Sequence, residues 1–402
     1  MPGIDLEPHG RPFIWALFLL IGEIAITLFF VAGTHEWIEP MLAFITGRHG
    51  WLPPLGQPLT TDFASFYAAG KLALAGTAEL AYDQAAHQAA EWAATTPGVQ
   101  YQFFFYPPVF LLLAAPLALM PYMVAFAVFE SGTLLLYLAA LRAILGLAGW
   151  RWLVPALAFP AVFWTLGLGQ NAFLSAALFA VGTRLLDRRP GLAGLALGAL
   201  VFKPHLGLLI PLALLAGRHF RAVAGAAVAA GGLILVSWLL FGTAAWTAFL
   251  AVFMGAHGTY ENGRIELAGM ITVFSAARLL GAPVAVAYAA QAVVGVAAAA
   301  GMAVLFWCRA PLPLRAASLL TATLLALPVL LLYDLMLLAV AGAWLLVDAR
   351  ERGLRLPERV ALVAGFAMPL ICRPIGLGLS IGVAPLAAAG VLAAAIWRSR
   401  GR

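Results

Sequence analysis

Residues 283–308 of this chain read PVAVAYAAQAVVGVAAAAGMAVLFWC, and Arg309 follows directly. The stretch contains no Asp, Glu, Lys or Arg. It is long enough for a transmembrane helix, which needs about 20 consecutive apolar residues. Similar runs recur from Phe13 to Trp397. The sequence therefore predicts an all-α polytopic membrane protein, with residues 1–402 forming a single integral membrane domain.

The composition excludes several other classes of protein. Hydrophobic residues make up 64% of the 402 positions and charged residues only 10%, whereas soluble domains carry about 25% charged residues. This balance excludes a soluble globular enzyme, and it excludes a disordered chain, which needs low hydrophobicity. The apolar runs are continuous rather than alternating, so an outer-membrane barrel is excluded too. Cys308 and Cys372 are too few and too far apart to predict a disulfide framework or a cysteine-ligated metal.

The basic residues indicate how the chain is threaded through the membrane. Two long polar stretches, 34–121 and 242–282, interrupt the apolar segments. With the N-terminus inside and twelve passes, both stretches lie outside and 17 of the 23 basic residues lie inside, as the positive-inside rule expects. The predicted passes are 13–33 (an uncleaved signal anchor), 122–145, 153–168, 171–186, 191–203, 205–216, 220–241, 283–308, 314–332, 335–347, 358–372 and 376–397.

A second threading is also compatible with twelve passes. In it, residues 191–216 form one proline-kinked helix and residues 108–120 cross the membrane. It leaves four arginines outside, so the first threading is preferred. These are Arg151, Arg184, Arg188 and Arg189.

The first outer stretch, 34–121, is predicted to contain helices that lie at the membrane surface. Thr60 or Thr61 can cap a helix with Asp62 in its first turn, and an acid there is commonly only a capping residue. Residues 72–91 are amphipathic and predict a surface helix. Pro107 and Pro108 can open a helix, so 109–120 is predicted as a juxtamembrane or re-entrant helix.

A few polar residues interrupt the apolar segments near the outer face. Gln170 and Asn171 separate two apolar helices, either as helix caps or as ligands for sugar hydroxyls. Lys203, one of two lysines, costs at least ~2.5 kcal/mol within an apolar segment. It either extends its ammonium to the interface or binds a lipid phosphate.

The second outer stretch and the later helices add further candidates. Arg264 and Arg278 carry guanidinium groups that match phosphate oxygens, although Glu261 or Glu266 can simply pair with them. Asp334 lies between two apolar helices at the outer face. The histidines form no metal-binding motif. No resident cofactor is predicted, and a divalent metal is left open.

Several short motifs together resemble glycosyltransferase family 87, a bacterial membrane family of the GT-C class. They extend over roughly residues 60–380: Asp62-Phe63 with Tyr67-Ala68, Leu80-Ala81-Tyr82-Asp83, Phe105-Tyr106-Pro107-Pro108, Gly169-Gln170-Asn171, Lys203-Pro204 and Tyr333-Asp334-Leu335. The resemblance implies a GT-C fold, with about 12 transmembrane helices and periplasmic juxtamembrane helices. It also implies inverting transfer of a sugar, often mannose, from a polyprenyl-phosphate donor at the periplasmic face of the inner membrane.

The resemblance also implies roles for individual residues. GT-C enzymes use an acid of the first outer loop as catalytic base, and Asp62 occupies the matching position. The donor phosphate is expected to contact Lys203, Arg264, Arg278 and His205. The sugar or the acceptor is expected to contact Tyr106, Gln170, Asn171, His257, Tyr333 and Asp334.

The expected partners are membrane lipids, the polyprenyl-phosphate sugar and a lipid or glycan acceptor, and no nucleic acid. The termini are expected in the cytoplasm and the active site in the periplasm. The alternative function is a lipid or small-solute transporter or flippase that uses Lys203 and Asp334 as intramembrane charges. A non-catalytic membrane scaffold is a third possibility. The absence of a visible internal repeat weakens the transporter hypothesis.

Overall fold

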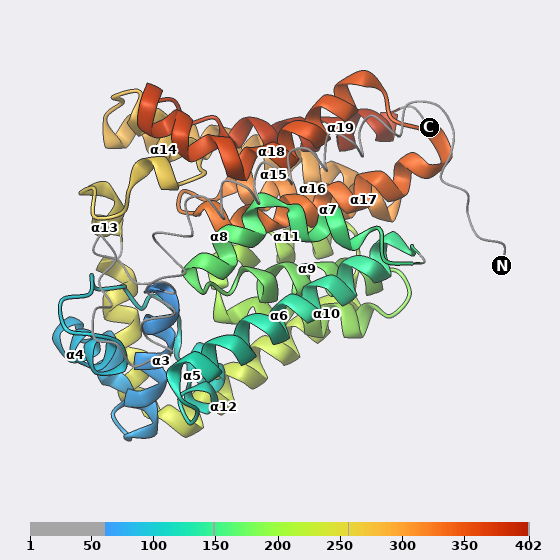
Figure 1. Cartoon of the computed structure of the whole chain (residues 1–402). Helices are drawn as coiled ribbons and strands as arrows, with labels where there is room; N and C mark the ends of the chain where they lie inside the picture. The colour runs from blue at the N-terminus through green and yellow to red at the C-terminus, as the bar shows by residue number, and fades with distance from the viewer. Residues whose placement is uncertain (1–60, 148, 256, 401–402) are drawn as a thin grey trace.

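The computed structural model describes residues 61–147, 149–255 and 257–400, and within them the chain is helical, without a named strand (Figure 1). The predicted first pass, 13–33, and residues 34–60 of the first outer stretch lie outside the described residues. Met270 and Leu331 form an isolated antiparallel bridge. The described part therefore agrees with the predicted all-α class.

The first outer stretch folds into short helices rather than one long surface helix. The elements are α3 (Thr61–Leu74), η2 (Ala78–Tyr82), α4 (Gln84–Ala94), η3 (Pro108–Phe110) and α5 (Leu111–Leu117). The prediction of a single helix over 72–91 is wrong. Gly76 has a φ of 78°, which ends the helical path, and Asp83 starts α4 by accepting a 2.9 Å hydrogen bond from the Ala86 N–H. The helix predicted over 109–120 is present as η3 and α5.

The central part of the chain follows the predicted apolar segments closely. Proline and glycine break several of them into two helices, since residues before proline avoid the helical conformation. The elements are α6 (Tyr122–Leu145), α7 (Leu153–Ala158), α8 (Pro160–Leu168), α9 (Ala172–Leu185), α10 (Pro190–Gly198), η4 (Ala199–Phe202), η5 (Pro204–Gly207) and α11 (Ile210–Ala216).

The second outer stretch contains more helix than the prediction of a loop over 242–282 allows. Helix α12 (Phe220–Gly255) continues past Gly242, whose φ of 76° and ψ of 173° interrupt it locally. The part after Gly242 is apolar and packs against η2 and η3, with the Phe249 ring 5.9 Å from Tyr82. Three short elements follow: α13 (His257–Glu261), η6 (Leu267–Gly269) and α14 (Val273–Leu279).

The C-terminal part is a bundle of long helices. The predicted break at Arg373-Pro374 is wrong: α18 runs through Pro369 and Pro374, and the chain turns at Ser380 instead. A proline removes one N–H donor, and a membrane helix tolerates this where neighbouring groups satisfy the freed backbone. The elements are α15 (Val284–Trp307), α16 (Leu312–Ala326), η7 (Leu332–Leu335), α17 (Met336–Arg352), α18 (Leu356–Leu379) and α19 (Ala384–Arg400).

Among the described residues, five helices are long and apolar enough to cross a membrane. They are Tyr122–Leu145, Phe220–Glu261, Val284–Trp307, Leu332–Arg350 and Leu356–Leu379. Shorter apolar helices lie among them, as the predicted short passes require. The apolar helices indicate a membrane protein. The count of twelve passes and the GT-C fold stay predictions.

The two ends of the bundle differ in charge. In Figure 1, α3, α4, α13 and α14 lie at the left, and the C-terminus lies at the right. Several arginines bind groups at the ends of helices remote from α3: Arg184 contacts the Ala143 carbonyl, Arg315 contacts Asp187, and Arg398 contacts Asp348. The first threading expects such a separation of basic turns from the outer stretches, and it stays a prediction.

Glycines allow α10 and α12 to pack at backbone contact. A Cβ on Gly194 would lie 2.0 Å from the Ala222 carbonyl oxygen, and one on Gly198 would lie 2.3 Å from that of Ala226. Small residues at such spacing let membrane helices approach closely, where apolar lipid provides little hydrophobic driving force. This contact supports η4 and hence the position of Lys203, which follows it.

The α10–α12 contact predicts that a glycine-to-alanine substitution affects stability differently inside the contact and outside it. Gly194→Ala should destabilise the protein, because the new methyl group meets backbone atoms that cannot move aside. Gly232→Ala, on exposed α12 surface with nothing within 4 Å, should be neutral or stabilise by at most about 1 kcal/mol through helix propensity. The thermal unfolding temperatures of the detergent-solubilised variants measure both. Equal temperatures would show that the two helices do not depend on this contact.

Candidate active site

Asp62 lies in the first turn of α3, where aromatic packing holds the helix. The adjacent Phe63 is fully buried, and its ring lies 5.4 Å from Tyr122 and 5.5 Å from Phe126. Asp62 itself is half-buried, and its Oδ2 accepts a 2.8 Å hydrogen bond from Gln170 Nε2. No capping hydrogen bond of Asp62 to its own helix is found among the described contacts. The carboxylate is thus oriented by a residue 108 positions away in the sequence.

The environment of Asp62 shifts its acidity. Burial raises the pKa of the Asp62 carboxyl to about 6, against the opposing effects of the Gln170 hydrogen bond and the Lys203 charge. Desolvation disfavours the charged form, whereas a donor and a nearby cation favour it. A general base works best with a pKa close to the working pH. Asp62 therefore has the acidity expected of a base at neutral pH.

The turn between α8 and α9 carries two buried amides, of which Gln170 contacts Asp62. Gly169 ends α8 with a φ of 68°, and a Cβ there would lie 2.6 Å from the Phe63 Cβ. Gln170 follows, and its Oε1 accepts from the Tyr106 hydroxyl at 3.3 Å and from the Asn171 N–H at 3.2 Å. Two donors at Oε1 fix the orientation of the amide, so its NH₂ points at the carboxylate.

Tyr106 reaches this turn from the extended segment before η3. Its ring stacks on Phe110 at 4.6 Å and meets Phe66 edge-on at 5.2 Å, and its carbonyl accepts from the Tyr82 hydroxyl at 3.0 Å. Burial raises the pKa of the Tyr106 hydroxyl well above its usual range. The hydroxyl therefore remains a donor at any physiological pH.

Lys203 and Asp334 form a buried ion pair beside the amides. Lys203 Nζ lies 2.6 Å from Asp334 Oδ1 and 3.4 Å from Asn171 Oδ1, and both charged side chains are 3% exposed. Asp334 Oδ2 also accepts from the Leu331 N–H, and the ammonium lies 4.9 Å from the Tyr333 ring centre. Lys203 lies in a non-helical break between η4 and η5, and Asp334 lies in η7. Both charged residues therefore lie where an apolar helical segment is interrupted.

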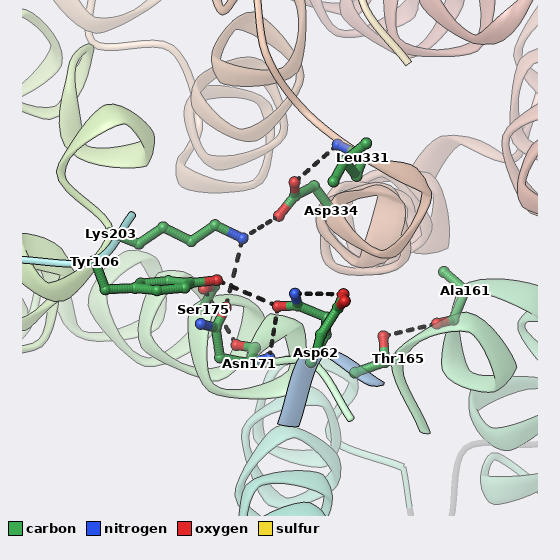
Figure 2. A network of polar contacts seen from close by, with 10 residues as sticks. Asp62, Tyr106, Ala161, Thr165, Asn171, Ser175, Lys203, Leu331 and Asp334 are labelled. Atoms are coloured by element: carbon green, nitrogen blue, oxygen red, sulfur yellow. Dashed lines mark hydrogen bonds and ion pairs between the residues drawn. The ribbon is translucent and has the colours of Figure 1, made fainter. Parts of the chain in front are cut away.

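These contacts form one continuous polar network, shown in Figure 2. It runs from Asp62 through Gln170 to Tyr106 and Asn171, and on through Lys203 to Asp334. Asn171 Nδ2 is buried without a hydrogen-bond partner among the described residues. A buried amide NH₂ without a partner is costly and is an available donor for a ligand oxygen.

The family assignment covers the central part of the chain. A model of glycosyltransferase family 87 matches residues 104–332. The chain belongs to this family. Membership indicates a glycosyltransferase and agrees with the resemblance drawn from the motifs, although the matched residues span less of the chain than those motifs do. They contain Tyr106, Gln170, Asn171 and Lys203, whereas Asp62 and Asp334 lie outside them. Comparison with curated proteins and comparison with solved structures found no match to this chain.

Three of the residues expected at the site of this glycosyltransferase, Arg264, Arg278 and His205, lie outside the network. Arg264 is exposed in the turn after α13, and Arg278 Nη1 donates to the Ala282 carbonyl at 2.7 Å. His205 is exposed, two residues after Lys203. The side chain of His257 lies outside what the structure describes. Among the described contacts, none joins Arg264 or Arg278 to Lys203.

Sequence reasoning missed a buried pair close to Asp62. His87 and Glu91 on α4 are 0% and 1% exposed, and the charge of Asp62 acts on Glu91. Their spacing of four residues on one helix is the signal that could have found them.

The buried Lys203–Asp334 pair predicts a double-mutant result. Asp334→Asn leaves a buried, uncompensated ammonium and should cost about 3–5 kcal/mol. Lys203→Met combined with Asp334→Asn removes both charges and should recover most of that loss. Thermal unfolding of the purified variants measures the effect.

The half-exposed pair of Arg373 and Glu266, whose side chains are 38% and 44% exposed, is the matched control. Arg373→Met should cost at most about 1 kcal/mol. If the double variant at positions 203 and 334 is as unstable as Asp334→Asn alone, the pair does not act as a charge-compensated unit.

Proposed function

We propose that this protein transfers a sugar, with mannose the expected one, from a polyprenyl-phosphate donor to a hydroxyl of a lipid or glycan acceptor. The reaction takes place at the periplasmic face of the bacterial inner membrane, and both termini lie in the cytoplasm. The observation that carries the proposal is the hydrogen-bonded carboxylate of half-buried Asp62 at one end of a network whose other members include four residues within the range that the family model matches.

In the proposed reaction Asp62 acts as general base. It takes the proton of the acceptor hydroxyl, and the acceptor oxygen forms a bond to the anomeric carbon. The bond between that carbon and the phosphate oxygen breaks, and its electron pair leaves with polyprenyl phosphate. A single displacement of this kind inverts the anomeric configuration, by analogy with inverting sugar hydrolysis.

The other network residues act on the sugar and the leaving group. The buried NH₂ of Asn171 and the amide of Gln170 are placed to bind sugar oxygens, with Tyr106 holding Gln170. The positive charge of Lys203 stabilises the departing phosphate. Asp334 already neutralises Lys203 in this structure, so the phosphate competes with that carboxylate. Arg264 and Arg278 of the second outer stretch are proposed to supply the additional positive charge.

The proposal predicts the effect of removing the base. Asp62→Asn keeps the shape of the side chain but cannot accept the proton, so turnover should fall about 10²–10⁴-fold. The measurement is transfer of radiolabelled mannose from polyprenyl-phosphate mannose to a total lipid extract, with the products resolved by chromatography.

The matched control for this assay is Asp83→Asn in the same outer stretch. Asp83 is exposed, and asparagine caps a helix as well as aspartate does, so activity should be retained. Full turnover by Asp62→Asn would exclude Asp62 as the base. No product from wild type with any polyprenyl-phosphate sugar would instead favour the transporter hypothesis, in which Lys203 and Asp334 move charge.

The raised pKa of Asp62 predicts the acid side of the pH profile. The base must be deprotonated, and its pKa is about 6. Activity should therefore be high near pH 7 and fall as the pH drops through about 6. Initial rates at saturating donor between pH 5 and pH 7.5 test this, and a midpoint near pH 4 would contradict it.

A further inference from the structure

A buried polar cluster lies between α3, the helix that carries Asp62, and α4. It consists of Ser65 on α3 and of His87 and Glu91 on α4, which are 1%, 0% and 1% exposed. His87 Nε2 lies 3.0 Å from the Ser65 carbonyl oxygen. A carbonyl oxygen only accepts, so Nε2 carries the proton and Nδ1 is left as an acceptor. Ser65 lies on α3 three residues after Asp62. The hydrogen bond of His87 therefore links α4 to the N-terminal part of α3.

Glu91 links α4 to the extended segment that carries Tyr106. Its Oε2 accepts a hydrogen bond from the Gln102 N–H at 3.2 Å. Aromatic rings of this extended segment enclose the imidazole of His87, with ring centres at 5.6 Å for Tyr101 and 5.8 Å for Phe104. The two residues on α4 therefore contact both chain segments whose side chains meet at Gln170.

One nitrogen of His87 and one oxygen of Glu91 lie near each other without forming a hydrogen bond in the structure. His87 Nδ1 and Glu91 Oε1 lie 3.6 Å apart, and neither has a hydrogen-bond partner among the described residues. Burial lowers the pKa of His87 to about 4 and raises the pKa of Glu91 to about 8. At neutral pH both groups are uncharged, so a protonated Glu91 can donate to the free Nδ1 lone pair.

We propose that His87 and Glu91 form an uncharged buried clamp that positions Asp62 and Tyr106 relative to each other. They are positioning residues, since each acts through backbone groups of α3 and of the segment before η3. This inference rests on the proposed function in one respect only, that Asp62 is the base. The clamp is open to an independent structural test, because its contacts hold two segments whether or not a substrate is present.

The clamp makes the site sensitive to alkaline pH. Ionisation of Glu91 removes its donor to His87 and places a negative charge near Asp62 on α3, which faces it. The charges of Glu91 and Asp83 also act electrostatically on Tyr101 of the extended segment. No cation is found among the described contacts of Glu91 to offset this charge. Activity should therefore fall on the alkaline side, through about pH 8.

The deciding experiment compares Glu91→Gln with Glu91→Ala. Glutamine keeps an oxygen for the Gln102 N–H and an NH₂ for His87 Nδ1, but it cannot ionise. Glu91→Gln should keep wild-type turnover at pH 7 and lose the alkaline fall. Glu91→Ala should lower kcat by about tenfold or more with little change in KM, because misplacement of a base affects the chemical step. Glu79→Gln, a carboxyl group of η2, is the matched control and should keep the wild-type profile.

Hydrogen–deuterium exchange provides a readout without any substrate. Glu91→Ala should speed exchange in peptides covering residues 61–74 and 99–107, whereas Glu91→Gln should not. Unchanged exchange in Glu91→Ala, or an alkaline fall that persists in Glu91→Gln, would overturn the clamp. Full activity of Asp62→Asn would instead overturn the proposed function and leave the exchange result standing, so the two failures are distinguishable.

Discussion

The buried ion pair between Lys203 and Asp334 joins parts of the chain that would otherwise meet only through apolar contacts. Each partner comes from a break in an apolar helix, and such a break exposes backbone groups that a membrane interior cannot satisfy. Here the Asp334 carboxylate meets both the ammonium and the Leu331 N–H. Because the ammonium also reaches Asn171, the position of the amide turn depends on this pair.

A second set of contacts fixes the other end of the network. The turn between α8 and α9 needs a glycine, since Gly169 has a positive φ and lies against Phe63. That close approach brings Gln170 within hydrogen-bond distance of Asp62. Burial of the Asp62 carboxyl in this packed region raises its pKa. The acidity of the proposed base is thus a consequence of packing.

The polar network and several arginine ion pairs lie at different places in the helical bundle. The network gathers at the end of the bundle near α3 and α8, and the ion pairs of Arg315 and Arg398 lie at helix ends remote from it. In a proposed membrane-bound transferase this arrangement serves two purposes. The arginines orient the protein in the bilayer, and the opposite end remains free to bind an anionic lipid donor.

Much of the site could be predicted from the sequence, because rare polar residues in apolar segments are conspicuous. Gln170, Asn171, Lys203 and Asp334 were singled out in this way, whereas Asp62, Tyr106 and Tyr333 were assigned roles through the resemblance to the family. The structure brings all seven together. Arg264 and Arg278 were selected by charge alone, and they lie outside the network because charge does not specify where an outer segment folds. His87 and Glu91 were not predicted as site residues, because a short amphipathic pattern does not show which of its polar side chains are buried.

The sequence by itself determined the helical class, the membrane setting and the segments that pack in it, since run length and arginine placement are local properties. It could not determine which polar groups pair. Lys203 meets Asp334 across 131 positions and Gln170 meets Asp62 across 108. Such contacts, and the turn at Ser380 that replaced the predicted break at Arg373-Pro374, depend on how helices pack. Only the tertiary structure decided them, because burial and hydrogen-bond geometry arise when distant segments meet.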